Sequence, residues 1–510
     1  MARMSTKNAP AVAACVLGLL AAVLLIRLGA QDRGGPPHGD ISIGSGIPAT
    51  LFVPGEPDAD DFPYAPPDSD RFPLLVIGHG YSGDRQSVGA LARSLAKAGY
   101  AVVTFDFRGH GDNTKAFQGD LRQDFDEVLD WATTSPYIDP RRIAVLGHSM
   151  GAGAALDFAT VDSRPVAVVP ISGGFVVNDV RMPANVLLLV ASGDPDRITD
   201  RQRSIARDLE GRTNLRSVEI KGANHLTIVT SDDTVAAIAG FLDPVLRPTT
   251  PGPRPAKLDD PRRSTALAYL LVAIALIGLL GTFVGRLVAP LRADPSAGAL
   301  LLLAGALLIA MPLLATGGYN ILPIGAGQPV VVHLSLAGAA LWATRFYARR
   351  AQPARVSRWI GDEPWFPSRS AAGAGLVGAL VVFVLLAPLS VVSHRLVPTT
   401  ERLVLLVVVA ALSLVFFAPF EALVRRGGTW TAVGLGVVGR LMLVAAIFIG
   451  VGLHALPAVI LLVAPLFIVQ YVILEVFAGT CYAAGRNPAV IAVVESVLVA
   501  WIVTTLTPIS

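Results

Sequence analysis

Long apolar stretches and short apolar runs divide this 510-residue chain into two kinds of sequence. One long stretch covers residues 9 to 26, and eight more follow residue 264. Most approach the ~20 residues that a helix needs to cross a bilayer. The pattern therefore predicts nine membrane-spanning helices. The eight later stretches are residues 265–285, 298–316, 328–344, 371–393, 403–424, 431–453, 456–476 and 488–506.

Between the first long stretch and the others, short apolar runs alternate with amphipathic stretches. The short runs predict buried strands and the amphipathic stretches predict helices. This alternation favours an α/β fold, a mostly parallel sheet with helices on both faces and functional groups at the carboxyl ends of the strands. The predicted strands are residues 74–77, 101–105, 143–146, 166–171, 186–190 and 218–220, and the predicted helices are 85–98, 118–133, 150–160, 200–210 and 231–242.

Composition marks the expected domain boundaries. Sequence rich in Pro, Gly and Asp follows the first long stretch, and a Pro-rich basic segment precedes the later ones, as expected of linkers. Cleavage after Ala30 would place Leu28 where a small residue is preferred, so we expect an uncleaved anchor. The predicted parts are a signal anchor (1–30), a linker (31–46), an α/β domain (47–243), a Pro-rich linker (244–264) and a membrane bundle of about eight helices (265–510).

Charge separates the same two kinds of sequence. Only 15% of the residues are charged and 53% are hydrophobic, which excludes a wholly soluble protein. Residues 31–263 contain 24 Lys and Arg against 31 Asp and Glu, a net charge of −7, whereas the remainder contains 17 against 7, or +10. A basic excess in short loops between apolar stretches is typical of membrane proteins, so the expected partner is a lipid bilayer and not a nucleic acid.

The arginines also predict an orientation. With a cytoplasmic N-terminus, nine crossings place eleven loop arginines in the cytoplasm and leave only Arg395 and Arg402 in the opposite loops. The positive-inside rule therefore predicts an integral membrane protein whose residues 31–263 lie outside the cytoplasm. The eleven are Arg286, Arg292, Arg345, Arg349, Arg350, Arg355, Arg358, Arg369, Arg425, Arg426 and Arg486.

A Gly-x-Ser-x-Gly pattern indicates a nucleophile. Gly147 and Gly151 flank Ser149 directly after a predicted strand and before a helix of small residues. That context is the one a nucleophile elbow requires, because glycines allow the sharp turn that exposes the serine. The glycine-rich turn after an earlier strand can aim a backbone N–H at a developing oxyanion, and the expected donors are the amides of Tyr81 and Met150.

Two further strand ends supply the remaining groups of a nucleophilic site. Asp194 and Asp196 follow the next-to-last predicted strand, and either carboxylate could orient a histidine. His225 follows the last predicted strand. The chain order Ser, Asp, His, with each residue at a strand end, predicts His225 as the general base. Cys15 and Cys481 are the two cysteines, so no disulfide framework is expected.

These motifs together resemble the α/β-hydrolase superfamily, in particular its dienelactone-hydrolase-like and serine esterase or lipase-like members. Residues 105–113 look like the Asp-x-Arg-Gly-His-Gly turn of that superfamily, which makes His110 structural and not the base. The run from Gly193 to Asp196 looks like its acid loop, so the resemblance favours Asp196 over Asp194. It implies acyl transfer through a covalent Ser149 intermediate, with neither a metal nor an organic cofactor.

The sequence thus predicts a membrane-anchored serine hydrolase that cleaves a carboxylic ester or a related acyl bond. About a dozen residues separate Ile171 from the strand at Val186, which leaves no room for a large cap and suits an extended or membrane-borne substrate. Two alternatives stay open. One is acyl transfer to a lipid or sugar hydroxyl, and the other is a transporter or flippase bundle with a hydrolase-like binding domain.

Ionisable residues also fall within the predicted spans, where they usually face the interior of a helix bundle. Arg440 lies in the middle of its span, and we expect it to pair with Glu475 or Glu495, either in a structural ion pair or in a pathway or head-group site. For Glu421 and Glu475, near the cytoplasmic ends, the simplest expectation is that each reaches the interface.

Overall fold

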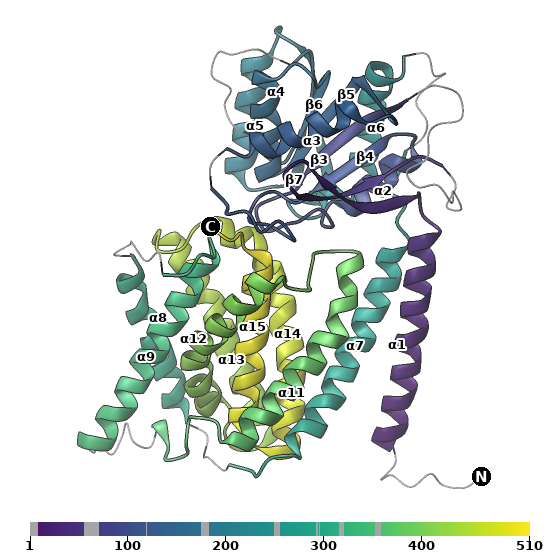
Figure 1. Ribbon diagram of the computed structural model, residues 1–510. Helices are drawn as coiled ribbons and strands as arrows, with labels where there is room; N and C mark the ends of the chain where they lie inside the picture. Colours follow the sequence, from purple (N-terminus) through teal and green to yellow (C-terminus); the bar gives the residue numbers. More distant parts are fainter. Residues whose placement is uncertain are drawn as a thin grey trace. The chain divides into compact units, whose positions relative to one another are not determined.

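In the computed structural model the chain divides into two compact units (Figure 1). The sheet unit comprises Ile26–Ala266, Leu389–Arg395 and Pro508–Ser510, and the helical unit comprises Met1–Leu25, Leu267–Pro388 and Leu396–Thr507. The residues described are 9–55, 71–118, 120–174, 183–248, 256–291, 294, 296–315, 321–351 and 359–510.

Eight strands form one sheet in the order β1-β2-β4-β3-β5-β6-β7-β8. Strands from β3 to β8 pair in parallel, while β1 and β2 pair antiparallel with each other and β2 antiparallel with β4. All six expected strands are present, and the mostly parallel sheet confirms the α/β fold. The strands are β1 (His38–Ile43), β2 (Ile47–Phe52), β3 (Phe72–Gly78), β4 (Ala101–Phe105), β5 (Ile138–His148), β6 (Ala167–Ile171), β7 (Asn185–Gly193) and β8 (Asn214–Asn224).

The first two strands are absent from the sequence prediction. Residues 31–46, expected as a linker, contain β1 and the turn to β2. Gly44 (φ 54°) and Gly46 (φ 101°) supply the left-handed backbone of that turn, which other residues rarely adopt. Residues 31–46 are rich in glycine, so the segment resembles a linker in the sequence. In the structure it forms the edge strand of the sheet. Of the second expected linker, residues 249–255 lie outside the described part of the chain.

Helices cover both faces of the sheet (Figure 1). Along β3, Leu74 and Val76 face one core with side chains of α3, α4 and α5, while Leu75 and Ile77 face another core with α2 and α6. This alternation is the two-residue period of a strand buried on both sides. The helices are α2 (Gly89–Lys97), α3 (Arg122–Thr134), α4 (Met150–Val161), α5 (Asp196–Leu209) and α6 (Asp232–Leu246).

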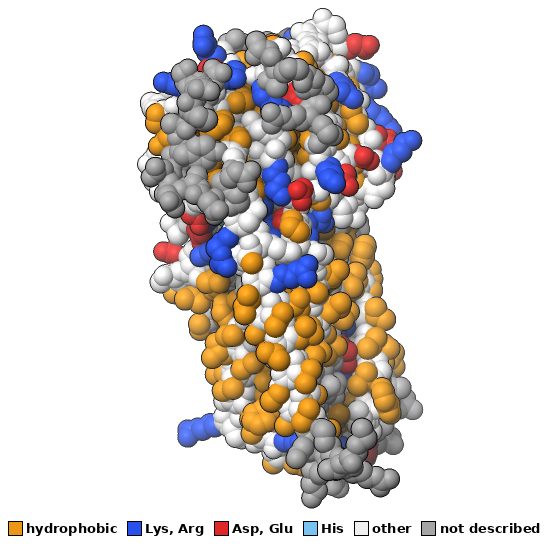
Figure 2. Space-filling view, turned by 90° about the vertical axis from the view of Figure 1, so that its right-hand side faces the viewer, with side chains coloured by type: hydrophobic (Ala, Val, Ile, Leu, Met, Phe, Trp, Pro, Cys, Tyr) orange, Lys and Arg blue, Asp and Glu red, His pale blue; other side chains and the backbone are white. Residues whose placement is uncertain are grey.

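Nine helices of the described residues are long and apolar enough to cross a membrane. Large apolar side chains such as Leu271, Leu380 and Leu441 are exposed on them, and apolar side chains dominate their surface in Figure 2. Such a surface suits lipid and is compatible with an integral membrane protein. The helices are α1 (Ala9–Arg33), α7 (Arg262–Gly285), α8 (Ala297–Ala315), α9 (Gly327–Ala351), α11 (Arg369–Leu386), α12 (Thr400–Val424), α13 (Thr429–Gly452), α14 (Val459–Gly485) and α15 (Pro488–Leu506).

Inside the helical unit, two arginines and three glutamates from four helices form one ion network. Arg440 lies 3.1 Å from Glu421 and 2.5 Å from Glu475, and it also pairs with Glu495. Arg425 lies 2.9 Å from Glu421 and 2.5 Å from Glu475. Arg440 thus pairs with both expected partners, and Glu421 is buried in the network instead of reaching the interface.

We expect Arg440→Leu to destabilise the helical unit by about 3–5 kcal/mol, because it leaves buried carboxylates without their counter-charge. Leu441→Ala, at an exposed neighbouring position, serves as the control and should cost less than about 1 kcal/mol. The measurement is the thermal unfolding midpoint of the full chain in detergent. Equal midpoints for the two variants would show that the network does not stabilise the helices.

Candidate active site

Ser149 occupies a strained turn between β5 and α4. Its backbone has φ 53° and ψ −110°, a conformation that non-glycine residues rarely adopt outside functional sites. The turn is crowded by backbone: a Cβ at Gly147 would lie 2.0 Å from the Gly151 carbonyl oxygen, and a Cβ at Gly151 would lie 2.6 Å from the Gly78 carbonyl oxygen. Only glycine fits at both positions, so the turn has the geometry expected of a nucleophile elbow, with the serine at its tip.

His225 directly follows β8 and lies beside the serine. Its Nε2 is 3.0 Å from Ser149 Oγ, and its Nδ1 is 2.7 Å from Asp194 Oδ1. The imidazole is largely buried, and the carboxylate of Asp194 is enclosed as well. The three side chains therefore form a continuous hydrogen-bonded series from hydroxyl to imidazole to carboxylate.

The carboxylate beside His225 belongs to Asp194 and not to Asp196, the residue that the resemblance favoured. The Oδ2 of Asp194 accepts hydrogen bonds from the Ala191 amide (2.8 Å) and the Ser172 hydroxyl (2.5 Å). Burial acts to raise the pKa of Asp194, but hydrogen bonds from His225 and Ser172 hold it below its usual value. Asp196 is exposed and begins α5, where the helix dipole favours a carboxylate.

The loop after β3 passes beside Ser149. A Cβ at Gly80 would lie 3.4 Å from the Cβ of Ser149, so the backbone leading into Tyr81 is close to the hydroxyl. On the other side, Met150 begins α4 immediately after the serine. The structure therefore brings both expected donor segments to Ser149, and the oxyanion role of their amides stays a prediction.

Two buried histidines shape this region without carrying charge. His79 Nε2 accepts a hydrogen bond from the Phe107 amide (3.1 Å), which leaves Nδ1 to donate to the Gly80 carbonyl (2.8 Å). His148 Nε2 donates to the carbonyl of His225 (2.8 Å). Burial lowers the pKa of His79 and of His148 to about 3, so both are neutral near pH 7. Each holds a loop of the site in place through its hydrogen bonds to backbone groups.

His110, the other histidine considered as a base, lies with its two ring nitrogens 2.9 Å and 2.8 Å from the carbonyl oxygens of Arg108 and Tyr81. It thus braces the Tyr81 loop. The same loop is anchored by Arg85, whose amide donates to Asp106 (2.7 Å) and whose guanidinium forms an ion pair with that carboxylate. Arg85 could not be identified from the sequence, because a single arginine in a polar loop gives no signal of its buried partner.

Two further expectations concern the surroundings of the site. Among the described residues, no group of three or more His, Cys, Asp or Glu side chains is placed to hold a metal ion. The segment between β6 and β7, where the sequence predicts no large cap, includes residues 175–182, which lie outside the described part of the chain.

Comparisons with known proteins match the sheet unit. Residues 70–192 match the family model described as serine aminopeptidase, S33. The chain is 32% identical over 148 residues to the quorum-quenching protein AidA of Acinetobacter baumannii, covering 26% of this chain and 47% of that protein. It is 27% identical over 215 residues to the cutinase est2 of Thermobifida alba, covering 39% of this chain and 70% of that protein. The chain thus spans about half the length of the first of these relatives.

Solved structures with a similar fold include hydrolases. A putative dienelactone hydrolase from Klebsiella pneumoniae is 20% identical with a TM-score of 0.31, over 38% of this chain and 88% of that one. An esterase from Pyrobaculum calidifontis is 18% identical with a TM-score of 0.34, over 48% of this chain and 93% of that one.

The choice of acid is testable at the nucleophile itself. We expect Asp194→Asn to slow labelling of Ser149 by a fluorophosphonate probe about 10³- to 10⁴-fold, because His225 loses the partner that orients it and stabilises its charge. Asp196→Asn should change the rate less than about threefold, since an exposed charge contributes little. Thermal unfolding confirms that both variants are folded. Equal slowing in the two variants, or slowing in Asp196→Asn alone, would contradict the geometry.

Proposed function

We propose that this chain, which carries an α/β-hydrolase domain of the serine-hydrolase type, cleaves carboxylic esters through Ser149, His225 and Asp194. The single observation that carries the proposal is the series of two hydrogen bonds, 3.0 Å and 2.7 Å, that joins hydroxyl, imidazole and carboxylate. Each group follows a different strand of one sheet. A purely structural serine needs neither this alignment nor a strained backbone.

The first half-reaction forms an acyl-enzyme. His225 Nε2 takes the proton of Ser149 Oγ as that oxygen attacks the ester carbonyl carbon. Asp194 holds the Nδ1–H and stabilises the imidazolium that results. When the tetrahedral intermediate collapses, the carbon–oxygen bond to the alcohol breaks and the imidazolium returns its proton to the leaving alkoxide.

Charge on the former carbonyl oxygen is stabilised by the backbone amides of Tyr81 and Met150. The supporting observation is that the loop at Gly80 and the start of α4 both lie against Ser149. Preorganised amides favour the tetrahedral intermediate over the planar ester, and the loss of one such donor costs about 10²- to 10³-fold in comparable sites. In the second half-reaction water attacks the acyl-enzyme, with His225 again as the base, and no step requires a metal or a cofactor.

The substrate class follows from relatives and from the membrane helices. Relatives of the sheet unit include proteins named as cutinases, and one solved structure with a similar fold is an esterase. A domain attached on both sides to long apolar helices is held near lipid. We therefore propose an acyl ester that is membrane-borne or reaches the membrane surface as the substrate.

The sheet unit faces away from the cytoplasm in this proposal. Support comes from the exposed arginines at the ends of the helices, since the nine candidate spans with a cytoplasmic N-terminus keep Arg286, Arg349, Arg350, Arg369 and Arg486 on the cytoplasmic side. Three further loop arginines counted from the sequence, at positions 292, 355 and 358, lie outside the described residues.

The proposed activity is tested by release of a chromogenic short-chain ester from the detergent-purified full chain. We expect Ser149→Ala and His225→Ala each to lower turnover by more than about 10³-fold, because either change disables the acyl-transfer step. The control is Ser217→Ala, at an exposed serine on β8, which should leave turnover unchanged. Equal turnover in all four proteins would reject the proposed mechanism.

Orientation is tested with an impermeant maleimide on sealed right-side-out vesicles. A cysteine at Ser82, in a chain whose Cys15 and Cys481 are replaced, should be labelled without permeabilisation, because that loop belongs to the sheet unit. A cysteine at the exposed Arg349 should be labelled only after permeabilisation. The reverse pattern would place the active site in the cytoplasm.

A further inference from the structure

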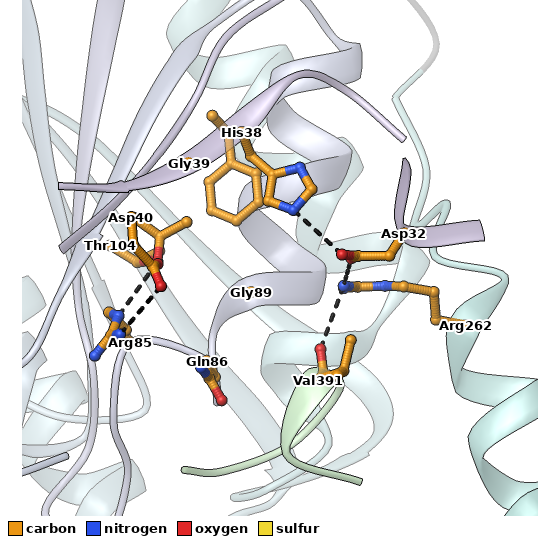
Figure 3. Close-up of a pocket in the computed structure, with 12 residues that line it drawn as sticks. Asp32, His38, Gly39, Asp40, Arg85, Gln86, Gly89, Thr104, Arg262 and Val391 are labelled. Atoms are coloured by element: carbon orange, nitrogen blue, oxygen red, sulfur yellow. Dashed lines mark hydrogen bonds and ion pairs between the residues drawn. The ribbon is translucent and has the colours of Figure 1, made fainter. Parts of the chain in front are cut away.

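A polar cavity of about 300 Å³ lies at the β1–β2–β4 side of the sheet (Figure 3). Sheet order separates it from the candidate active site, because Ser149, Asp194 and His225 follow β5, β7 and β8, on the other side of β3. Its volume is at the lower end of the ~300–1,000 Å³ range of small-molecule sites. The cavity is therefore distinct from the site of the proposed hydrolysis, and a ligand can bind there whether or not Ser149 is a nucleophile.

One wall of the cavity is a polar row that runs across three strands. Asp40, Thr50 and Thr104 are register partners on β1, β2 and β4. The Thr50 hydroxyl donates to Asp40 Oδ1 (2.7 Å). A second wall is apolar, since the His38 ring stacks on Phe52 with centroids 5.4 Å apart and 14° between the planes. Figure 3 shows His38 and Asp40 on different sides of the hollow.

Arg85, the first of two arginines that line the cavity, is already neutralised by carboxylates. Its guanidinium forms an ion pair with Asp106 and lies 3.0 Å from Asp112 and 3.6 Å from Asp40. The side chain is almost fully buried among these three acids. An anionic ligand would have to compete with all of them for this cation.

The second lining arginine, Arg262, is committed in the same way. It lies 2.6 Å from Asp32 and 2.7 Å from Asp260, and it donates to the Val391 carbonyl (3.2 Å). Arg93, next to the lining, also pairs with Asp32. Both lining arginines therefore have acidic partners, which disfavours a ligand that binds to them through an anionic group.

In the described lining, the buried side-chain atoms without a hydrogen-bond partner can accept hydrogen bonds. Gln86 Oε1 and Thr104 Oγ1 are buried with no hydrogen-bond partner, and Thr104 is fully buried. A buried acceptor without a partner costs about 1–3 kcal/mol, which a donating ligand would recover. The Asp40 side chain is 66% exposed and lies 3.6 Å from its nearest arginine, whereas Asp32 is already paired with Arg262 and Arg93. An exposed carboxylate with neutral acceptors and an aromatic wall matches a group that is cationic and donates several N–H bonds, a primary ammonium.

Two residues that line the cavity belong to the ends of candidate membrane spans. Asp32 lies in the last turn of α1, and Arg262 is the first residue of α7. Both helices are long and apolar enough to cross a bilayer. The polar end of such a helix lies at the depth of the lipid headgroups. A membrane lipid is therefore the nearest source of the ammonium group.

We propose that this cavity binds the primary ammonium headgroup of a membrane lipid. Asp40, whose carboxylate is 66% exposed, supplies the negative charge, and Gln86 Oε1 and Thr104 Oγ1 accept N–H bonds from the ammonium. The test uses native mass spectrometry of the full chain in detergent, titrated separately with three lipids. Phosphatidylethanolamine has a primary ammonium, phosphatidylcholine has a quaternary ammonium without N–H donors, and phosphatidylglycerol has no cationic group.

Phosphatidylethanolamine should bind about tenfold more tightly than the other two, as expected for charge-assisted hydrogen bonds. Asp40→Asn should remove the preference by removing charge, and Gly89→Leu should remove it by filling the cavity, because the Cβ position of Gly89 faces open space. The matched controls are Asp200→Asn, an exposed acid on α5, and Gly240→Leu, a glycine on α6 that also faces open space. Both controls should keep the preference.

Three results would overturn the proposal. Equal affinity for the three lipids would remove the role of the ammonium. An unchanged preference in both Asp40→Asn and Gly89→Leu, each with an unaltered unfolding midpoint, would place the lipid elsewhere. Binding of free ethanolamine without any preference for phosphatidylethanolamine would show that the ligand is a soluble amine and not a lipid headgroup.

Discussion

The crowded turn at Ser149 is the constraint on which the rest of the sheet unit depends. Backbone from three elements meets there: Ser149 N donates to the Ile171 carbonyl (2.9 Å), and a Cβ at Gly173 would lie 2.3 Å from the Ser149 carbonyl oxygen. On the other side Gly151 packs against Gly78. A residue with φ 53° persists only where its surroundings determine it. The ends of β3, β5 and β6 must therefore be in register before the hydroxyl can meet His225.

How far the sequence predicts this fold depends on how each strand is buried. Strands β3 to β7 contain runs of apolar residues, and the nine spans are long and apolar, so both were predictable. Of β8, which is mostly exposed, the sequence predicted only residues 218–220. The strand His38–Ile43 was not predictable, because it is mostly polar, with only Ile43 fully buried. An edge strand beside a glycine turn contains too few apolar positions to show a two-residue period. β1 is extended because its backbone pairs with that of β2, and its own residue pattern does not indicate this pairing.

The residues of the candidate site divide in a similar way. Ser149 and His225 were predictable because each is the one candidate at its strand end. The acid was not, since Asp194 and Asp196 are two residues apart and only the turn after β7 decides which one faces the imidazole. That turn bonds the Asp194 amide to the Ala191 carbonyl (3.0 Å), which directs its side chain back toward the sheet. The spacing of the two aspartates in the sequence does not show in which direction the turn points each side chain.

A single buried ion pair connects the two polar sites of the sheet unit. Asp106 is fully buried and bonds both the amide and the guanidinium of Arg85. A Cβ at Gly111 would lie 2.4 Å from its carboxylate, so the turn after β4 closes around it. The loop held in this way begins beside Ser149 at Gly80 and ends in the cavity wall at Arg85. Breaking a buried ion pair leaves a charge without compensation. The loop beside Ser149 and the wall of the cavity must therefore keep or lose their geometry together.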